Sequence, residues 1–166
     1  MTKPIFRGVA TALYTPFKNE GKTVDYAAFE RLIERQLQAG INSLVVLGTT
    51  GESPTVTAGE RKEIISLVVK RVNGRVPVIV GAGSNCTVTA AKLSREAEKL
   101  GANAVLSVTP YYNKCNENGL LRHYAAIASA TDLPIIIYNV PSRTGIDVSP
   151  ETYAKLARIK TVAAIK

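Results

Sequence analysis

Short apolar runs alternate with amphipathic stretches along the whole chain. The runs are four to six residues long, and they lack the polar–apolar alternation that half-exposed strands show. We expect strands at Val9–Tyr14, Ser43–Leu47, Val76–Val80, Ala104–Val108, Ile135–Asn139 and Val162–Ile165. Such runs are typical of parallel strands that are buried on both faces.

Helical patterns fill the intervals between these runs. The first helix carries an apolar face of Tyr26, Phe29, Leu32, Ile33 and Leu37, before a stop at Gly40. Thr57–Glu60 has the form of a capping box that opens the second helix. Further helices are expected over Val88–Leu100 and Gly119–Ala130, and a last one opens at Ser149–Glu151, where Ser149 is the N-cap.

Strict alternation of strand and helix predicts one α/β domain with a parallel sheet and right-handed crossovers. Two architectures fit: an open doubly wound sheet, or part of a (β/α)8 barrel. Length alone favours the open sheet, because a whole barrel takes about 250 residues. The chain ends on a strand pattern, residues 161–166, with no covering helix after it. We therefore expect a truncated chain.

Composition narrows the function classes. The net charge is +8, but the densest basic group, Lys70, Arg71 and Arg75, lies at a helix end and has no interleaved aromatic residues. This favours a solvated face over a nucleic-acid site. No apolar run approaches the roughly 18 residues that a membrane span needs.

The cysteines and the N-terminus favour a reducing compartment. Cys86 and Cys115 form no paired motif, so neither a disulfide framework nor a cysteine metal site is indicated. Residues 1–4 are charged and broken by proline, which is unlike a secretory signal. A cytoplasmic location is the expectation.

The chemistry is expected where parallel strands end, because ligands gather at their carboxyl ends. Those ends carry Thr15–Phe17, Gly48–Ser53, Gly81–Asn85, Thr109–Asn113, Tyr138–Arg143 and Lys166. Together they supply hydroxyls, phenols, an arginine and a lysine, with almost no carboxylates and no metal ligands. A Ser-His-Asp hydrolase is disfavoured, since the single histidine, His123, falls in mid-helix and is expected on its surface.

Two glycine-containing turns leave alternatives open. Gly81-Ala82-Gly83 begins like a dinucleotide fingerprint, but Cys86 occupies the third glycine position, so turn geometry is favoured. The 48–53 loop is either a nest that binds a carboxylate through its amides and hydroxyls, or a plain strand-to-helix turn.

Lys166 is the pivotal residue. At the end of a buried strand its ammonium would be desolvated, which lowers the pKa of a lysine and frees the amine to attack carbonyls. Tyr138 lies at the matching end of the neighbouring strand, where its phenol is either a proton relay or a core aromatic with a satisfied hydroxyl.

These motifs together resemble the 4-hydroxy-tetrahydrodipicolinate synthase (dihydrodipicolinate synthase) family of pyruvate-dependent Schiff-base lyases. The resemblance rests on Gly8–Phe17, GTTGES (48–53), VTPYYN (108–113), YNVPSRTG (138–145) and the lysine-terminated strand. It implies a (β/α)8 barrel of which residues 1–166 hold strands one to six only. It also implies a condensation of pyruvate with L-aspartate 4-semialdehyde in lysine and diaminopimelate biosynthesis.

The resemblance assigns four catalytic roles. Lys166 corresponds to the lysine that forms the Schiff base with pyruvate. Tyr138 corresponds to the tyrosine that donates and accepts protons, and Thr49 and Tyr112 correspond to the other members of that relay. No cofactor and no metal are implied.

Substrate-binding roles follow in the same way. Thr50, with backbone amides of its loop at Gly48 and Gly51, corresponds to the site of the pyruvate carboxylate. Arg143 corresponds to the arginine that receives the carboxylate of the semialdehyde.

The resemblance also implies a homo-oligomer, a dimer or tetramer. Tyr111 corresponds to the tyrosine that crosses the dimer interface. With Ser53 and Asn85 it also matches an interface pocket that binds the end product lysine in some members. The remaining pocket positions, where those members carry histidines and an acid, are here Ala58, Arg61 and Thr89. Thr89, at the position of the acid, cannot pair with a bound cation, and Arg61 in the pocket would repel it, so weak inhibition by lysine, or none, is expected.

Two other readings compete. One is a sister lyase for sialic acid or 2-keto-3-deoxy sugar acids, which the paired threonines and the SRTG run disfavour. The other is a half-barrel that associates through its open strand edges and is catalytically inert.

Overall fold

The computed structural model describes residues 4–166, so residues 1–3, part of the segment compared with a secretory signal, lie outside it. Six parallel strands form one sheet: β1 (Ala10–Ala12), β4 (Ser43–Val46), β5 (Val78–Gly81), β6 (Ala104–Val108), β7 (Ile135–Tyr138) and β8 (Val162–Ile165). Their spatial order is their order in the chain. A doubly wound sheet reverses its strand order at a switch point. The sequential order therefore decides for part of a barrel, against what length alone favoured.

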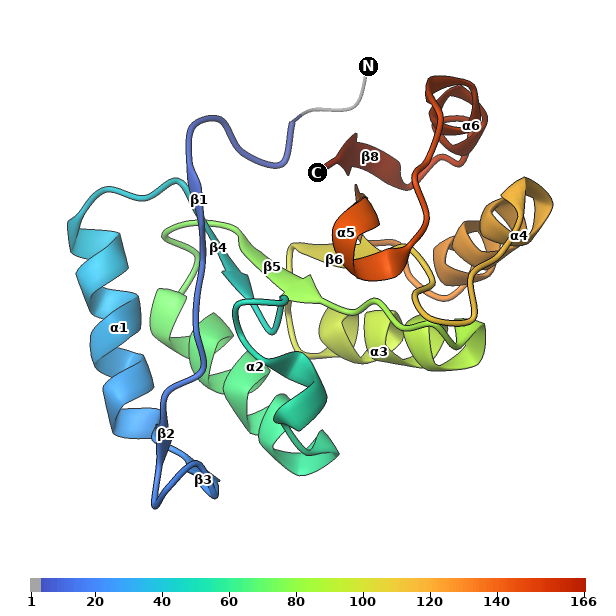
Figure 1. Cartoon of the computed structure of the whole chain (residues 1–166). Helices are drawn as coiled ribbons and strands as arrows, with labels where there is room; N and C mark the ends of the chain where they lie inside the picture. Colours follow the sequence, from blue (N-terminus) through green and yellow to red (C-terminus); the bar gives the residue numbers. More distant parts are fainter. Residues whose placement is uncertain (1–3) are drawn as a thin grey trace.

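Helices follow one another around the outside of the sheet (Figure 1). They are α1 (Tyr26–Gln38), α2 (Ala58–Val72), α3 (Thr87–Lys99), α4 (Glu117–Ala128) and α6 (Pro150–Leu156). The predicted capping box is present, since Thr57 Oγ1 accepts from the Glu60 amide and the Glu60 carboxylate accepts from the Thr57 amide. Ser149 caps α6 as expected, whereas α4 begins earlier than predicted, after an Asn116 cap.

Three short elements escaped the sequence patterns. They are the hairpin of β2 (Phe17–Lys18) and β3 (Thr23–Val24), the 3-10 turn Ser53–Thr55, and the one-turn helix α5 (Pro141–Thr144). Each is too short to develop a hydrophobic period, so only turn residues mark it. The last two matter for function because they follow β4 and β7, where the candidate chemistry lies.

The sheet has two differently covered faces. Val80, Val105, Ile135 and Ile137 lie in the main core beneath the helices and are fully buried. The opposite face holds a second cluster of Ile79, Ala104, Leu106 and Ile136, with Ile5, Phe6, Val45 and Tyr138 packed against it. The central strands are thus buried on both faces, as their continuous apolar runs predicted.

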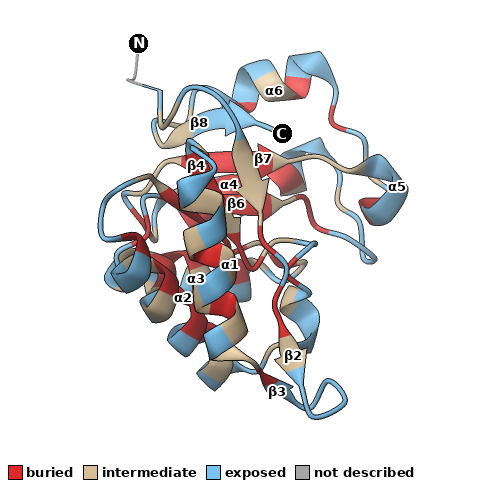
Figure 2. Ribbon diagram, turned by 90° about the vertical axis from the view of Figure 1, so that its left-hand side faces the viewer, coloured by how far each residue is buried: buried red, intermediate tan, exposed pale blue. Residues whose placement is uncertain are grey.

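The last strand departs from that expectation. In β8, Val162 is half-buried and the residues from Ala163 to Lys166 are exposed (Figure 2). Its only strand neighbour among the described residues is β7, and it takes no part in the cluster on the sheet's inner face. The prediction of a buried strand that desolvates Lys166 is therefore wrong for this chain.

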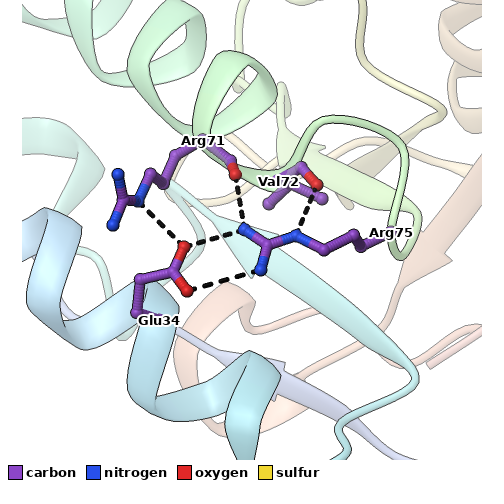
Figure 3. Close-up of polar contacts among 4 residues, drawn as sticks. All are labelled: Glu34, Arg71, Val72 and Arg75. Carbon is purple, nitrogen blue, oxygen red and sulfur yellow. Dashed lines mark hydrogen bonds and ion pairs between the residues drawn. The ribbon is translucent and has the colours of Figure 1, made fainter.

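Two of the three cations in the densest basic group share one carboxylate. Glu34 of α1 pairs with Arg71 Nε at 2.8 Å and Arg75 Nη2 at 2.7 Å (Figure 3). Arg75 also donates to the carbonyls of Arg71 and Val72, which caps the C-terminus of α2. These contacts tie α1 to α2 and give Arg71 and Arg75 a structural role. No helix of residues 4–166 is long and apolar enough to cross a membrane.

His123 is buried rather than on the helix surface. Only 3% of it is exposed, its Nδ1 lies 2.9 Å from Thr87 Oγ1, and its Nε2 has no partner among the described residues. Leu120 and Ile127, one helical turn before and after it, place His123 on the apolar face of α4, which packs against α3, and this signal was missed in the sequence. Burial lowers the pKa of the imidazole.

We predict an acid-sensitive contribution of His123 to stability. Because its folded pKa lies below the unfolded value of about 6.5, the unfolded chain binds the extra proton below that pH. Stability is retained above pH 6.5 and falls as the pH drops, by at most about 1.4 kcal/mol per pH unit. Urea unfolding of the chain and of His123→Gln between pH 7 and pH 5 measures this. The loss should be smaller in the variant, and parallel losses in both proteins would contradict the prediction.

Candidate active site

A cavity of about 270 Å³ opens at the carboxyl ends of β4 to β7. It is lined by Leu47, Gly48, Thr49, Ser53, Pro54, Gly81, Gly83, Leu106, Val108, Tyr111, Tyr138, Val140, Arg143 and Thr144. Among the residues singled out from the sequence, it brings together Gly48, Thr49, Ser53, Tyr111, Tyr138 and Arg143. The apolar lining comes from the inner face of the sheet, and the polar groups come from the loops.

Lys166 is not among the residues that line this cavity, but it contacts Tyr138, which is. The two residues are neighbours across the β7–β8 pair, where the Lys166 amide donates to Ile137 O at 2.8 Å and the Asn139 amide to Lys166 O at 2.9 Å. The Lys166 ammonium stands over the Tyr138 ring, 4.4 Å from its centroid. This is a cation–π distance, so the phenol and the amine face each other at one end of the sheet.

The loop after β4 has the geometry of an anion site. It closes on itself through the Gly51 amide to Gly48 O at 3.0 Å and the Glu52 amide to Thr49 O at 3.1 Å. The amides of Thr49 and Thr50 donate to no protein acceptor within the part of the chain that is described. Such free amides, with exposed hydroxyls beside them, match a carboxylate. This favours the nest over the plain turn.

Backbone strain surrounds this loop. Leu47 and Glu52 both have left-handed φ angles, 56° and 51°, which cost free energy in residues other than glycine. The buried Thr15 hydroxyl donates to Gly51 O at 2.7 Å and holds the loop from the side of β1. Thr15 was placed at a strand end by the sequence, but its supporting role required the structure.

The two glycines of Gly81-Ala82-Gly83 are required by close packing. A Cβ at Gly81 would lie 2.0 Å from Leu47 O, and one at Gly83 would lie 2.4 Å from the Val108 amide nitrogen. Turn geometry was the favoured interpretation, and the structure adds that neighbouring strand ends meet at these positions. Ser84 and Asn85, which follow, lie outside the cavity lining.

Some predicted residues stay outside the cavity. Thr50 and Gly51 belong to the loop but not to the lining. Asn85 is also outside the lining, and its carbonyl accepts from Asn113 Nδ2 at 3.3 Å. Tyr112 is 91% exposed with a left-handed φ of 66°, whereas Tyr111 is 37% exposed and lines the cavity. The structure therefore does not bring Tyr112 together with Thr49 and Tyr138.

Arg61 is also not where the resemblance led us to expect it. Its guanidinium is buried beneath α2, donates to Gly81 O at 2.7 Å and takes no part in the cavity lining. The expectation that Arg61 repels a cation in an interface pocket is therefore wrong, because its guanidinium is buried inside the fold. No group of three or more His, Cys, Asp or Glu side chains within residues 4–166 could hold a metal ion.

Comparison with known proteins agrees with this architecture. The sequence model of the dihydrodipicolinate synthetase family matches residues 5–166 of this chain. The 4-hydroxy-tetrahydrodipicolinate synthase of Alkaliphilus oremlandii is 55% identical over 162 residues, which are 98% of this chain and 55% of that protein. The chain thus spans about half the length of the curated relatives it matches.

Two solved structures extend the comparison. A dihydrodipicolinate synthase from Cyanidioschyzon merolae, described with lysine bound, superimposes with a TM-score of 0.95 at 44% identity, over 99% of this chain and 56% of that one. A structure described as the first monomeric dihydrodipicolinate synthase variant gives a TM-score of 0.94 at 55% identity, over 98% and 54%.

Proposed function

Because the chain belongs to the dihydrodipicolinate synthetase family, we propose that it carries the pyruvate-binding part of a Schiff-base lyase that condenses pyruvate with L-aspartate 4-semialdehyde. The single observation that carries the proposal is the Lys166 ammonium above the ring of Tyr138, a residue that lines the cavity beside the loop with free amides. Residues 1–166 would then supply the first five βα units and the sixth strand of the barrel domain.

The proposed reaction begins with an imine. The neutral amine of Lys166 adds to the ketone carbon of pyruvate, and loss of water leaves a protonated Schiff base. In this proposal the Tyr138 hydroxyl passes protons to and from the departing oxygen, together with Thr49, which lines the same cavity. The carboxylate of pyruvate would accept from the amides of Thr49 and Thr50 in the loop between Gly48 and Gly51.

The imine then acts as an electron sink. Loss of a methyl proton gives an enamine, whose carbon attacks the aldehyde of the second substrate. The amine of that substrate closes the ring on the imine carbon and releases Lys166, so the lysine is regenerated. Arg143, on α5 in the cavity lining, would hold the second carboxylate through a forked contact.

In this proposal Tyr112 takes the interface role that the resemblance gave to Tyr111, and Tyr111 takes the place in the cavity that it gave to Tyr112. An exposed Tyr112 suits contact with another copy of the chain better than a relay within its own cavity, and Tyr111 lines that cavity. We propose a homo-oligomer, a dimer or tetramer, acting in the cytoplasm in lysine and diaminopimelate biosynthesis.

The first prediction concerns Lys166. Borohydride reduction with pyruvate, followed by mass spectrometry, should place a reduced adduct on Lys166 of the natural gene product that contains this chain. Lys166→Arg keeps the charge but offers no such amine, and should give no adduct. An adduct on another lysine, or none, would reject the mechanism. The isolated 166 residues should react far more slowly, since β8 and Lys166 are exposed in them.

The second prediction separates the two substrates. Arg143→Ala should lower kcat/KM for aspartate semialdehyde by about 10²-fold, as expected from about 2–3 kcal/mol of charged hydrogen bonding. Formation of the pyruvate imine should persist, because Arg143 does not contact the loop amides. Arg143→Lys should recover only part of the loss, since an ammonium lacks the fork. Equal losses in both steps would show that Arg143 is structural. Sugar aldehydes as better substrates would favour the sister lyases.

The third prediction concerns lysine. Ser53 and Tyr111 are at the cavity, but Ala58 and Thr89 supply no acid for a bound cation, and Arg61 is turned inward. We therefore expect weak inhibition by lysine, or none, in contrast to what the lysine-bound relative suggests. A lysine titration of the gene product's activity measures this, and strong inhibition at sub-millimolar lysine would contradict it.

A further inference from the structure

Arg61 is a buried cation that none of the proposed chemical steps uses. Only 7% of the residue is exposed, and its Nη2 donates to the Gly81 carbonyl at 2.7 Å. Its Nε lies 3.9 Å from Glu96 of α3 and has no hydrogen-bond partner among residues 4–166. Burial lowers the pKa of this guanidinium to about 10, and Glu96 opposes the shift. Burying a charge is costly, so its contact with Gly81 calls for a physical reason.

Gly81 transmits the contact to the cavity. The backbone of Gly81 lies so close to the Leu47–Gly48 turn that a Cβ there would be 2.0 Å from Leu47 O and 2.9 Å from the Gly48 amide nitrogen. Both Gly81 and Gly48 line the cavity. A shift of Gly81 therefore pushes directly on the turn that presents the free amides.

The Leu47–Gly48 turn needs such support. Leu47 is 1% exposed and holds a left-handed φ of 56°, a conformation that leucine adopts only when its surroundings enforce it. Thr15 secures the far end of the loop through Gly51 O. On the near side, the Gly81 backbone fixed by Arg61 is the surface on which Leu47 rests.

We propose that Arg61 is a positioning residue for carboxylate binding: by holding the Gly81 carbonyl it fixes the Leu47–Gly48 turn and thereby the amides of Thr49 and Thr50. The proposal rests on the proposed function, because it takes pyruvate as the carboxylate that these amides bind. Arg61 itself touches no substrate. Its guanidinium spans α2, the end of β5 and α3, so it orders the site from behind.

The test compares Arg61→Met, Arg61→Lys and a matched control in the natural gene product. Lys62→Met is the control, because Lys62 is the next residue on α2, lies 3.4 Å from Glu96 and is mostly exposed. It removes a charge beside Glu96 without touching Gly81. Two readouts are needed: the pyruvate dependence of borohydride trapping at Lys166, and hydrogen exchange of the amides of residues 47–52.

Arg61→Met should raise the half-saturating pyruvate concentration by about tenfold, the effect of losing about 1.4 kcal/mol of carboxylate binding. The trapping rate at saturating pyruvate should change by less than about threefold, because the reacting groups are untouched. Exchange in residues 47–52 should accelerate. Arg61→Lys should recover part of both effects, and Lys62→Met should match the unmodified protein.

Several results would overturn the proposal. One is a folded Arg61→Met variant whose pyruvate dependence and loop exchange equal those of Lys62→Met. Another is a failure of both Arg61 variants to fold, which would make Arg61 a residue of general stability. If the unmodified protein traps no pyruvate, the proposed function fails. The loop exchange then still decides whether Arg61 orders the turn.

Discussion

The candidate site depends on one close approach, between the carboxyl ends of β4 and β5. At Gly81 the two backbones meet with no room for a side chain, and Leu47 takes a left-handed conformation against this contact. The loop that follows can then turn sharply, with Thr49 in the cavity lining and Thr50 next to it in the same loop. A glycine at this position is thus a geometric requirement of the neighbouring strand.

The sheet explains why the remaining polar groups converge. Parallel strands in sequential order place every carboxyl end at one edge, so loops that are far apart in the chain become neighbours. Tyr138 and Lys166 face each other for this reason, since Ile137 pairs with Ile165 and the next residues continue the register. The helices on the outer face bury the main core, and the inner face contributes the apolar floor of the cavity.

Although the chain carries a net charge of +8, several of its cations pair with carboxylates of neighbouring helices. Glu34 binds the two arginines at the end of α2, and Glu96 lies close to both Arg61 and Lys62. The exposed pairs contribute little to stability, whereas the buried Arg61 contact is specific in its geometry. Of these cations only Arg61 touches the strand ends that build the site, which separates it from the solvated charges around it.

The sequence by itself determined the strand and helix alternation, the capping residues Thr57 and Ser149, and the loops that carry the site. These are local signals, because a hydrophobic period or a cap is complete within a few residues. The length of the chain favoured an open doubly wound sheet. The observed strand order excludes it, and that order depends on pairing between segments far apart in the chain.

Tertiary structure decided the environment of individual side chains. His123 and Arg61 both fall on the apolar faces of their helices, but only the structure shows which groups meet their polar atoms. Lys166 belongs to an apolar strand but is exposed, because burial of a strand requires neighbours on its edge and faces. Tyr111 and Tyr112 are adjacent and chemically equal, yet only the loop geometry turns the first into the cavity and the second to solvent. The exposure of a residue depends on what packs against it, and the packing partners come from segments far from it in the chain.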